Sequence, residues 1–376
     1  MKAFVAIDSF KGCLSSREAC VAARLGLLDA GVAGEDITCL PLSDGGEGFC
    51  DTVARYAGGE AVTVRCQGPE GLVVDARYLL AEGTAYIESA SVCGYGQVTE
   101  GRRDPRLNSS YGLGLLISHA ARSGVERIVV GLGGTCTCDG GAGMLQALGA
   151  KFFEGNTLLD DGMPLLYHRI SSVDLSSVQS LPCRLEAWAD TSAPFFGEDG
   201  AVRVFGAQKG ISLADIPVAD DWMRRLFSFY SASADVSLSG TGAAGGIGGA
   251  LAAVLGAEIK SGAGMMVLLS GLEDSLRSCG DDKVLVLTGE GRYDSQTATG
   301  KLPHMVAETA RKACPEAVRI CLAGQVNAAA NGIFNHVLQV TPLDMEMKKA
   351  MDPVTASHNI RNSLLSLITS LLQEGA

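Results

Sequence analysis

One stretch of the chain, residues 127–145, constrains the fold more than any other. Its sequence, RIVVGLGGTCTCDGGAGML, begins with a short apolar run of β-branched residues and then enters a loop that contains six glycines. An apolar segment that is compatible with a helix follows from Met144. This order of residue types predicts a strand, a glycine-rich loop and a helix.

The loop in this stretch is a candidate anion-binding site. Glycines lack a Cβ atom, so their N–H groups can approach a ligand, and the next helix offers the positive end of its dipole. We therefore predict that Gly133 and Gly134 contact phosphate. The hydroxyls of Thr135 and Thr137 and the carboxylate of Asp139 could hold phosphate or a phosphate-bound metal. A glycine-rich turn that serves only tight packing of the helix on the strand is an equally good interpretation at this point.

Composition excludes several classes of function. The chain has 376 residues, of which 47% are hydrophobic and 19% charged, so it can bury a large core and its length suggests two domains. A net charge of −12 argues against a nucleic-acid or anionic-membrane surface. The sequence contains no run near the roughly 18 apolar residues of a spanning helix. Its 12 cysteines form no Cys-x-x-Cys pair, and the N-terminal apolar run is too short for a signal peptide, so we expect reduced thiols in the cytoplasm.

Two strand–loop–helix units open the chain. The apolar run at 3–7 leads into a loop with Lys11, and the run at 37–42 leads into Ser-Asp-Gly-Gly-Glu-Gly. Ligands bind beyond the carboxyl ends of the strands in an open α/β sheet, so both loops are candidate site loops. Carboxylates such as Asp44 and Glu47 suit Mg²⁺, which takes one or two of them together with phosphate oxygens and water. A helix-capping role for Asp44 is the alternative.

The pattern of residue types changes at residue 61. Three alternating or β-branched runs separated by glycine-rich turns, between residues 61 and 88, predict an antiparallel meander that begins a second domain. Further on, a strand at 185–189 ends at Asp190. We predict that Lys209 lies in a loop and contacts phosphate, with a solvated surface lysine as the alternative.

A second glycine-dense loop occupies residues 240–250 and contains Gly245 and Gly246. A helix follows it. Because no clear strand precedes this loop and no acid stands where a ribose partner is expected, we reject a Rossmann dinucleotide site.

The C-terminal part of the chain returns to the first sheet. The run at 283–287 is the most strand-like in the sequence, and further strands and an amphipathic helix follow it. We predict a parallel-sheet α/β domain built from residues 1–60 and 280–376, with residues 61–279 inserted as a mixed α/β domain. The loop after the 283–287 strand is predicted to carry four charged side chains, on Glu290, Arg292, Asp294 and Lys301.

Eight motifs, taken together and in order, resemble the glycerate kinase family, of the kind that phosphorylates glycerate with ATP. They span nearly the whole chain. The motifs are DSFKG at 8–12, SDGGEG at 43–48, ESA at 88–90, SYG at 110–112, the glycine loop at 131–143, QKG at 208–210, AAGG at 243–246, and TGEGR at 288–292 with Asp294, Gln296, Thr297, Gly300 and Lys301.

The resemblance implies a flavodoxin-like or Rossmann-like parallel-sheet domain, an inserted mixed domain, and an active site in the cleft between them. It implies ATP and Mg²⁺ as cofactors and D-glycerate as the substrate, with 2-phosphoglycerate as the usual product. The residues that we assign on this basis are as follows: Gly133, Gly134, Thr135, Thr137, Asp139, Gly245, Gly246 and Lys301 bind the nucleotide; Asp44 and Glu47 bind the metal; Ser9, Ser89 and Tyr111 bind the substrate; Lys11, Lys209 and Arg292 neutralise charge; and Asp190, or else Asp294, accepts the hydroxyl proton.

The chain departs from the family pattern at three positions where an asparagine is usual, which here are Asp104, Cys138 and Ala193. An amide both donates and accepts, so its replacement alters a polar pocket by roughly 1–3 kcal/mol per unpaired partner. A kinase of a related hydroxy acid or sugar acid is therefore an alternative, as is a catalytically silent relative that binds a metabolite. The sequence leaves the oligomeric state open, a homodimer included.

Overall fold

The structure is a computed structural model of the chain, and it describes residues 1–99, 104–159, 167–230, 239–294, 297, 300–327 and 332–374. Gln296, one of the motif residues, lies outside the described residues. The chain forms two compact units. The first comprises Met1–Asp44 and Ala263–Ala376, and the second comprises Gly45–Gly262.

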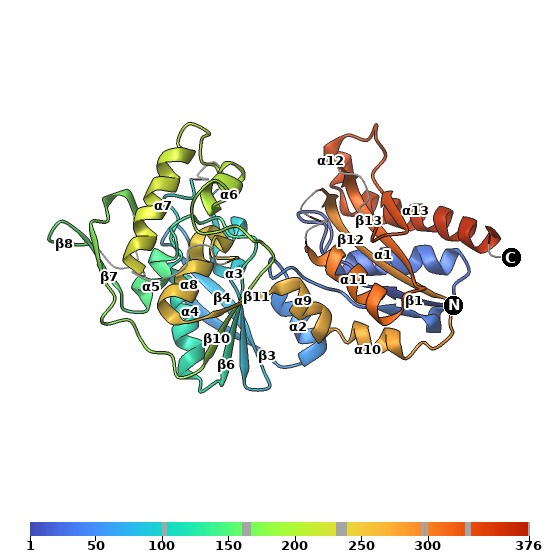
Figure 1. Ribbon diagram of the computed structural model, residues 1–376, viewed down its shortest axis with the longest axis horizontal. Coiled ribbons are helices and arrows are strands. Elements are labelled where there is room, and N and C mark those ends of the chain that lie inside the picture. Colours follow the sequence, from blue (N-terminus) through green and yellow to red (C-terminus); the bar gives the residue numbers. More distant parts are fainter. Residues whose placement is uncertain are drawn as a thin grey trace. The chain divides into compact units, whose positions relative to one another are not determined.

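The first unit contains a five-stranded parallel sheet (Figure 1). Its spatial order, β14-β13-β12-β1-β2, becomes 2-1-3-4-5 when the strands are counted along the chain within the unit, which is the flavodoxin-like order. The predicted fold class is thereby confirmed. The strands are β1 (Lys2–Val5), β2 (Ile37–Cys39), β12 (Val284–Tyr293), β13 (Val318–Val326) and β14 (His336–Gln339).

Helices cover both faces of this sheet. α1 and α13 share a buried core with one face, and α11 covers the other. Ser15 and Glu18 form a capping box that starts α1, and a Cβ atom on Gly26 of α1 would lie 2.6 Å from the Arg361 carbonyl oxygen of α13. The glycine thus permits close contact of the two helices. The helices are α1 (Ser16–Asp29), the 3₁₀ turn η1 (Gly34–Asp36), α9 (Gly262–Leu269), α10 (Leu272–Arg277), α11 (Leu302–Ala313), α12 (Met347–Ala350) and α13 (Pro353–Glu374).

β12 extends well past the predicted strand at 283–287, and this corrects one expectation. Glu290 and Arg292 lie on the strand and not in a loop, since Arg292 pairs with Gln325 of β13. Close approach of the two strands also needs Gly324, because a Cβ atom there would lie 2.6 Å from the Gly291 carbonyl oxygen. The glycines that indicated a loop therefore serve strand pairing.

The second unit contains a six-stranded mixed sheet in the order β11-β10-β6-β5-β4-β3. The meander β3-β4-β5 is antiparallel as predicted, whereas β5, β6, β10 and β11 are parallel. A small antiparallel sheet, β8-β7-β9, stands apart from it. The strands are β3 (Glu60–Gln67), β4 (Val73–Ala81), β5 (Thr84–Glu88), β6 (Arg127–Gly131), β7 (Lys151–Glu154), β8 (Thr157–Leu158), β9 (Ser172–Asp174), β10 (Arg184–Ala189) and β11 (Glu258–Ser261).

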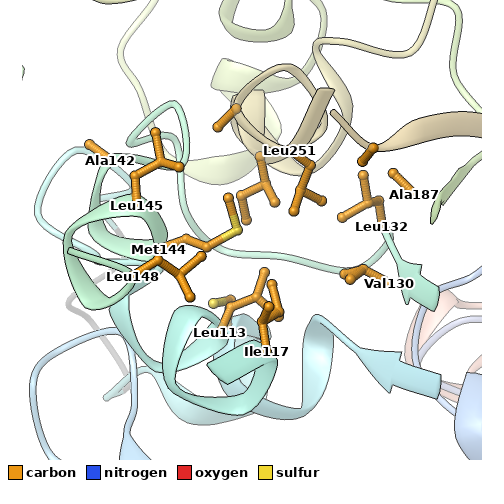
Figure 2. Close-up of a cluster of buried hydrophobic side chains, with 14 of the residues drawn as sticks. Leu113, Ile117, Val130, Leu132, Ala142, Met144, Leu145, Leu148, Ala187 and Leu251 are labelled. Carbon is orange, nitrogen blue, oxygen red and sulfur yellow. The ribbon is translucent and has the colours of Figure 1, made fainter. Parts of the chain in front are cut away.

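The core of the second unit lies between this sheet and three helices, α4, α5 and α8. Figure 2 shows Leu113 of α4, Met144 of α5 and Leu251 of α8 gathered around Val130 and Ala187 of the sheet. The helices of the unit are α2 (Phe49–Ala57), α3 (Ala90–Cys93), α4 (Tyr111–Arg122), α5 (Ala142–Ala147), α6 (Ala201–Lys209), α7 (Ile216–Tyr230) and α8 (Ile247–Leu255), with the 3₁₀ turns η2 (Tyr95–Gln97), η3 (Tyr167–Arg169) and η4 (Ala243–Gly246).

The bounds of the units differ from the sequence-based boundaries at residues 60 and 279. The helix α2 groups with the second unit because Phe49 packs edge-on against Tyr86 and Trp188, with ring centroids 6.3 and 5.7 Å apart. Burial of these aromatic rings fixes the helix on that sheet.

Candidate active site

The strand order of the first unit reverses between β1 and β12, and charged side chains gather there. Asp8 follows β1 and is only 6% exposed, and its N–H donates to the Gly289 carbonyl of β12 at 3.2 Å. Lys11 Nζ donates to Asp44 Oδ2 at 2.5 Å. Burial and the nearby Asp44 charge raise the pKa of Asp8 well above its usual range, and Lys11 opposes that shift. An open α/β sheet binds its ligands at this reversal point.

Glu290 brings a further carboxylate to the same place. The Thr297 hydroxyl donates to Glu290 Oε1 at 2.6 Å, and Glu290 acts electrostatically on both Asp8 and Lys11. Burial raises the pKa of Glu290. The structure thus brings the predicted residues Lys11 and Asp44 together with two acids, Asp8 and Glu290, that were not among the assigned site residues. A strand of buried apolar residues that runs directly into Asp8 was the signal that could have identified it.

Other predicted residues of this unit surround the reversal point. Lys301 directly precedes α11, and its Nζ lies 3.8 Å from Asp294 Oδ1. Asp294 also accepts a hydrogen bond from the Thr297 N–H at 3.4 Å. Arg292 is exposed on β12, and the Ser9 N–H donates to Asp8 Oδ1 at 2.7 Å.

In the second unit, the parallel strands end in polar residues along one edge of the sheet. Glu88 of β5 stands opposite Gly131 of β6, and its carboxylate accepts N–H bonds from Gly48 and Cys50, both at 3.2 Å. Ser89 is fully buried, and its hydroxyl donates to the Gly133 carbonyl at 3.5 Å. The predicted residue Ser89 therefore lies at the carboxyl edge of this sheet.

Asp190 follows β10 at the same edge. The hydroxyl of Ser261, the last residue of β11, donates to Asp190 Oδ1 at 3.4 Å. The carboxylate thus lies at the strand ends, where a reacting group can approach.

The glycine loop after β6 uses several of its N–H groups inside the protein. The N–H groups of Leu132, Cys136, Cys138 and Gly140 donate to the carbonyls of Trp188, Cys93, Pro105 and Gly245. A Cβ atom on Gly133 would lie 2.6 Å from the Cα atom of Gly46. Glycine is thus required at 133 for packing, and contact of Gly133 and Gly134 with phosphate stays a prediction.

Asp139 anchors the end of this loop. Its Oδ2 accepts from the Ser110 N–H and hydroxyl, both at 2.8 Å, and from the Gly143 N–H at 3.2 Å. Its Oδ1 accepts from the Gly141 N–H at 3.1 Å. Four donors inside the protein therefore hold the carboxylate that was predicted to contact the nucleotide.

Lys209 is the last residue of α6, so the prediction of a loop at this position was wrong. Gly210, with φ of 115°, ends the helix directly after it. The side chain is buried, and its Nζ donates to Thr135 Oγ1 at 3.1 Å and to the Thr137 carbonyl at 2.8 Å. The structure thus brings together three residues that the sequence assigned separately.

The second glycine loop packs on the first. A Cβ atom on Gly245 would lie 2.1 Å from the Thr137 carbonyl oxygen, and one on Gly246 would lie 2.8 Å from the Cα atom of Gly140. Ala244, between the loop entry and these glycines, also has positive φ, at 53°. These contacts explain the glycines by packing, and their contact with a nucleotide stays a prediction.

Comparison with known proteins decides the family. The model of a family described as the glycerate kinase family matches residues 3–372. The chain belongs to the glycerate kinase family. The glycerate 2-kinase of Escherichia coli (strain K12) is 35% identical over 97% of this chain and 98% of its own length, and the glycerate kinase of Bacillus subtilis (strain 168) is 35% identical over 89% and 88%. The crystal structure of glycerate kinase 2 from Salmonella typhimurium LT2 matches with a TM-score of 0.77 and 35% identity, over 100% of this chain and 99% of that one.

The three residues that depart from the glycerate kinase pattern are buried or partly buried. Cys138 is fully buried in the hydrophobic core, and Ala193 is 6% exposed. Asp104 binds Arg106 through two hydrogen bonds of 2.9 Å. Each side chain is thus used inside the fold. All 12 cysteines are free thiols.

Two further predictions for this glycerate kinase family member concern a metal site and membrane-spanning helices. Over the described ranges, His, Cys, Asp and Glu side chains form no group of three or more that could hold a metal ion. Asp44 belongs to the first unit and the exposed Glu47 to the second, so their joint binding of Mg²⁺ stays a prediction. Within the part of the chain that the structure describes, the helices are too short or too polar to cross a membrane.

Proposed function

We propose that this protein transfers the γ-phosphoryl group of ATP to a hydroxyl of D-glycerate and forms 2-phosphoglycerate. The observation that carries this proposal is the Lys11–Asp44 ion pair beside the buried Asp8, at the reversal point of a flavodoxin-like sheet, in a chain of this family. Phosphoryl transfer needs mainly positioned reactants and charges that neutralise the phosphates. This site supplies both signs of charge at a place where ligands bind.

We assign Mg²⁺ to the carboxylates of the first unit. Asp8 and Asp44 lie close enough for their charges to interact, and a divalent cation would offset that repulsion. Hard carboxylate oxygens, one or two at a time, are the ligands that Mg²⁺ takes beside phosphate. Bound there, the ion would neutralise charge on the transferring phosphoryl group. Glu47 stays a predicted ligand.

The cations and the proton acceptor have separate roles in this proposal. Lys11, Arg292 and Lys301 neutralise the nucleotide phosphates. Asp190 accepts the hydroxyl proton, and we prefer it to Asp294 because Asp294 is engaged with Lys301 and the Thr297 N–H. Contacts of the substrate with Ser9, Ser89 and Tyr111 remain part of the proposal. Tyr111 is the first residue of α4, and its N–H donates to the Ser109 hydroxyl at 3.1 Å.

A coupled ADP assay with a panel of small hydroxy acids and sugar acids tests the proposal. We expect D-glycerate to be the best acceptor, and we expect Lys11→Ala and Asp190→Asn to lower kcat/KM at least about 100-fold. The exposed Lys348→Ala is the matched control and should match the wild type. Near-normal turnover by both site variants would overturn the residue roles. A preference for another acid, or binding without turnover, would overturn the assigned activity.

A further inference from the structure

Lys209 is a buried cation whose hydrogen-bond acceptors are both neutral. Its side chain is 6% exposed, and its ammonium donates to the Thr135 hydroxyl and the Thr137 carbonyl at 3.1 and 2.8 Å. The ion pairs found among the described residues do not include Lys209. A buried charge without a counter-ion is costly, so its presence indicates an anionic partner from outside the protein.

Asp139, a buried acid of the same loop, forms no ion pair with Lys209 among the contacts of the described residues. Its two oxygens accept four hydrogen bonds, from Ser110, Gly141 and Gly143, at 2.8–3.2 Å. Neutral donors thus satisfy the oxygens of this carboxylate, and Lys209 is not among them. The ammonium group of Lys209 still has a third N–H for a ligand.

A second, independent observation points to the same place. Thr137 is completely buried, and its hydroxyl oxygen has no hydrogen-bond partner among the described residues. Buried hydroxyls are nearly always paired, and leaving one unpaired is destabilising. The Thr135 hydroxyl accepts from Lys209 and keeps its own hydrogen for donation. Two hydroxyl donors of this loop therefore accompany the one ammonium group that contacts it, that of Lys209 of α6.

We infer that Lys209 and the hydroxyls of Thr135 and Thr137 bind the carboxylate of the substrate acid. This inference rests on the proposed function. The nucleotide phosphates then bind at another site, because one ammonium group balances the single charge of a carboxylate but not the several charges of a triphosphate. The exposed or half-exposed cations Lys11 and Lys301 suit the phosphates better. The N–H groups of Leu132, Cys136, Cys138 and Gly140 in this glycine loop already donate to protein carbonyls.

Steady-state kinetics with D-glycerate and with its neutral amide test the inference. Lys209→Met keeps the length of the side chain and removes its charge. We expect it to raise the KM for D-glycerate at least about 100-fold, with the KM for ATP changed less than about threefold. Turnover of the neutral amide should change little, so the preference of the enzyme for the acid over the amide should largely disappear.

Thr137→Val decides the case if the Lys209 variant does not fold. This substitution removes a hydroxyl that binds no described protein group, so a purely structural role predicts an unchanged KM. We expect a KM for D-glycerate raised roughly 5- to 50-fold with intact folding, as for loss of one hydrogen bond to a charged group. A KM shift for ATP instead, or no KM shift in Thr137→Val, would overturn the inference while the proposed function stands. No turnover of D-glycerate by the wild type would overturn the proposed function and this inference with it.

Discussion

At the scale of single residues, each unit keeps an ionisable group where burial opposes its charge. Asp8 is buried beside Asp44, and Lys209 is buried against neutral oxygens. Such groups reduce stability unless a ligand or a counter-ion compensates them, and they are typical of functional sites. Replacement of such a group is therefore expected to lower activity and to raise stability.

Asp8→Asn should lower kcat at least about 100-fold and yet raise the free energy of unfolding at pH 7 in the presence of EDTA. The pKa of Asp8 is raised in the folded protein, so the folded state binds this proton more tightly than the unfolded state does. The ionised carboxylate therefore destabilises the fold. The gain in stability should shrink as pH falls toward the usual aspartate value of 3.8. Urea unfolding between pH 4 and 7 measures this. A variant that is less stable than the wild type at pH 7 would contradict the assignment.

Ser110→Ala should lower the free energy of unfolding by about 2–4 kcal/mol. The buried Ser110 hydroxyl donates to Asp139 at 2.8 Å and accepts from the Met144 N–H at 2.9 Å, so its loss leaves two buried groups short of a partner. Ser228→Ala is the control, since that hydroxyl is exposed and bonds only locally to the Arg225 carbonyl. Equal unfolding midpoints of the two variants in urea would show that the Ser110–Asp139 bonds do not hold the loop.

At the scale of elements, the sequence predicts the sheets because their strands are distinctive. β-Branched, apolar runs such as 283–287 give β12, and alternating runs between 61 and 88 give the β3-β4-β5 meander. Local sequence patterns mispredict the structure where pairing with a distant strand determines it. Gly289 and Gly291 indicate a loop by local rules, yet pairing with β13 keeps them in β12. Lys209 lies on α6 because Gly206 stands inside the helix and only Gly210 ends it, so the two glycines have different roles.

The sequence predicts which residue types occur at the candidate site, but it does not predict which of these residues are in contact. Lys11 and Asp44 stand at strand ends that the sequence reveals, so their meeting could be expected. The burial of Lys209 against Thr135 and Thr137 depends on residues more than 70 positions apart, and no local pattern encodes it. Glycines carry the most ambiguous signal, because a glycine needed for close packing resembles one that exposes its N–H to a ligand.

Gly245→Ala tests the packing interpretation of the second glycine loop. The new Cβ atom would lie 2.1 Å from the Thr137 carbonyl oxygen, at a φ of 68°. Gly256 has the same φ and open space around it, so Gly256→Ala isolates the backbone strain, which is about 1–2 kcal/mol. We expect Gly245→Ala to lose a further 1–3 kcal/mol or so in urea unfolding, from the steric clash. Equal losses for both variants would argue that the loop can move away without cost.

At the scale of the whole molecule, the chain carries a net charge of −12, and the proposed reaction requires it to bind two anions. Our proposal divides that task between the units. The first unit combines carboxylates for a divalent cation with the lysines that face phosphate, and the second holds a single buried ammonium for the acid. This division lets each site supply only the charge that its ligand needs.

Removal of the metal should abolish turnover without unfolding the protein. With excess EDTA we expect the rate of ADP formation to fall at least about 100-fold, and to return when Mg²⁺ exceeds the chelator. Circular dichroism should stay unchanged, since the described residues form no structural metal cluster. Full activity in EDTA would contradict the assignment of Mg²⁺ to Asp8 and Asp44.

Phosphorus NMR of the product shows whether the phosphoryl group is transferred to the 2-hydroxyl of D-glycerate, as we propose. After incubation with ATP, Mg²⁺ and D-glycerate, we expect a new phosphomonoester signal split into a doublet by the single proton on C2. A triplet would place the phosphate on the CH₂ group and contradict the proposed product. No new signal, with ATP unchanged, would contradict the proposed kinase activity itself.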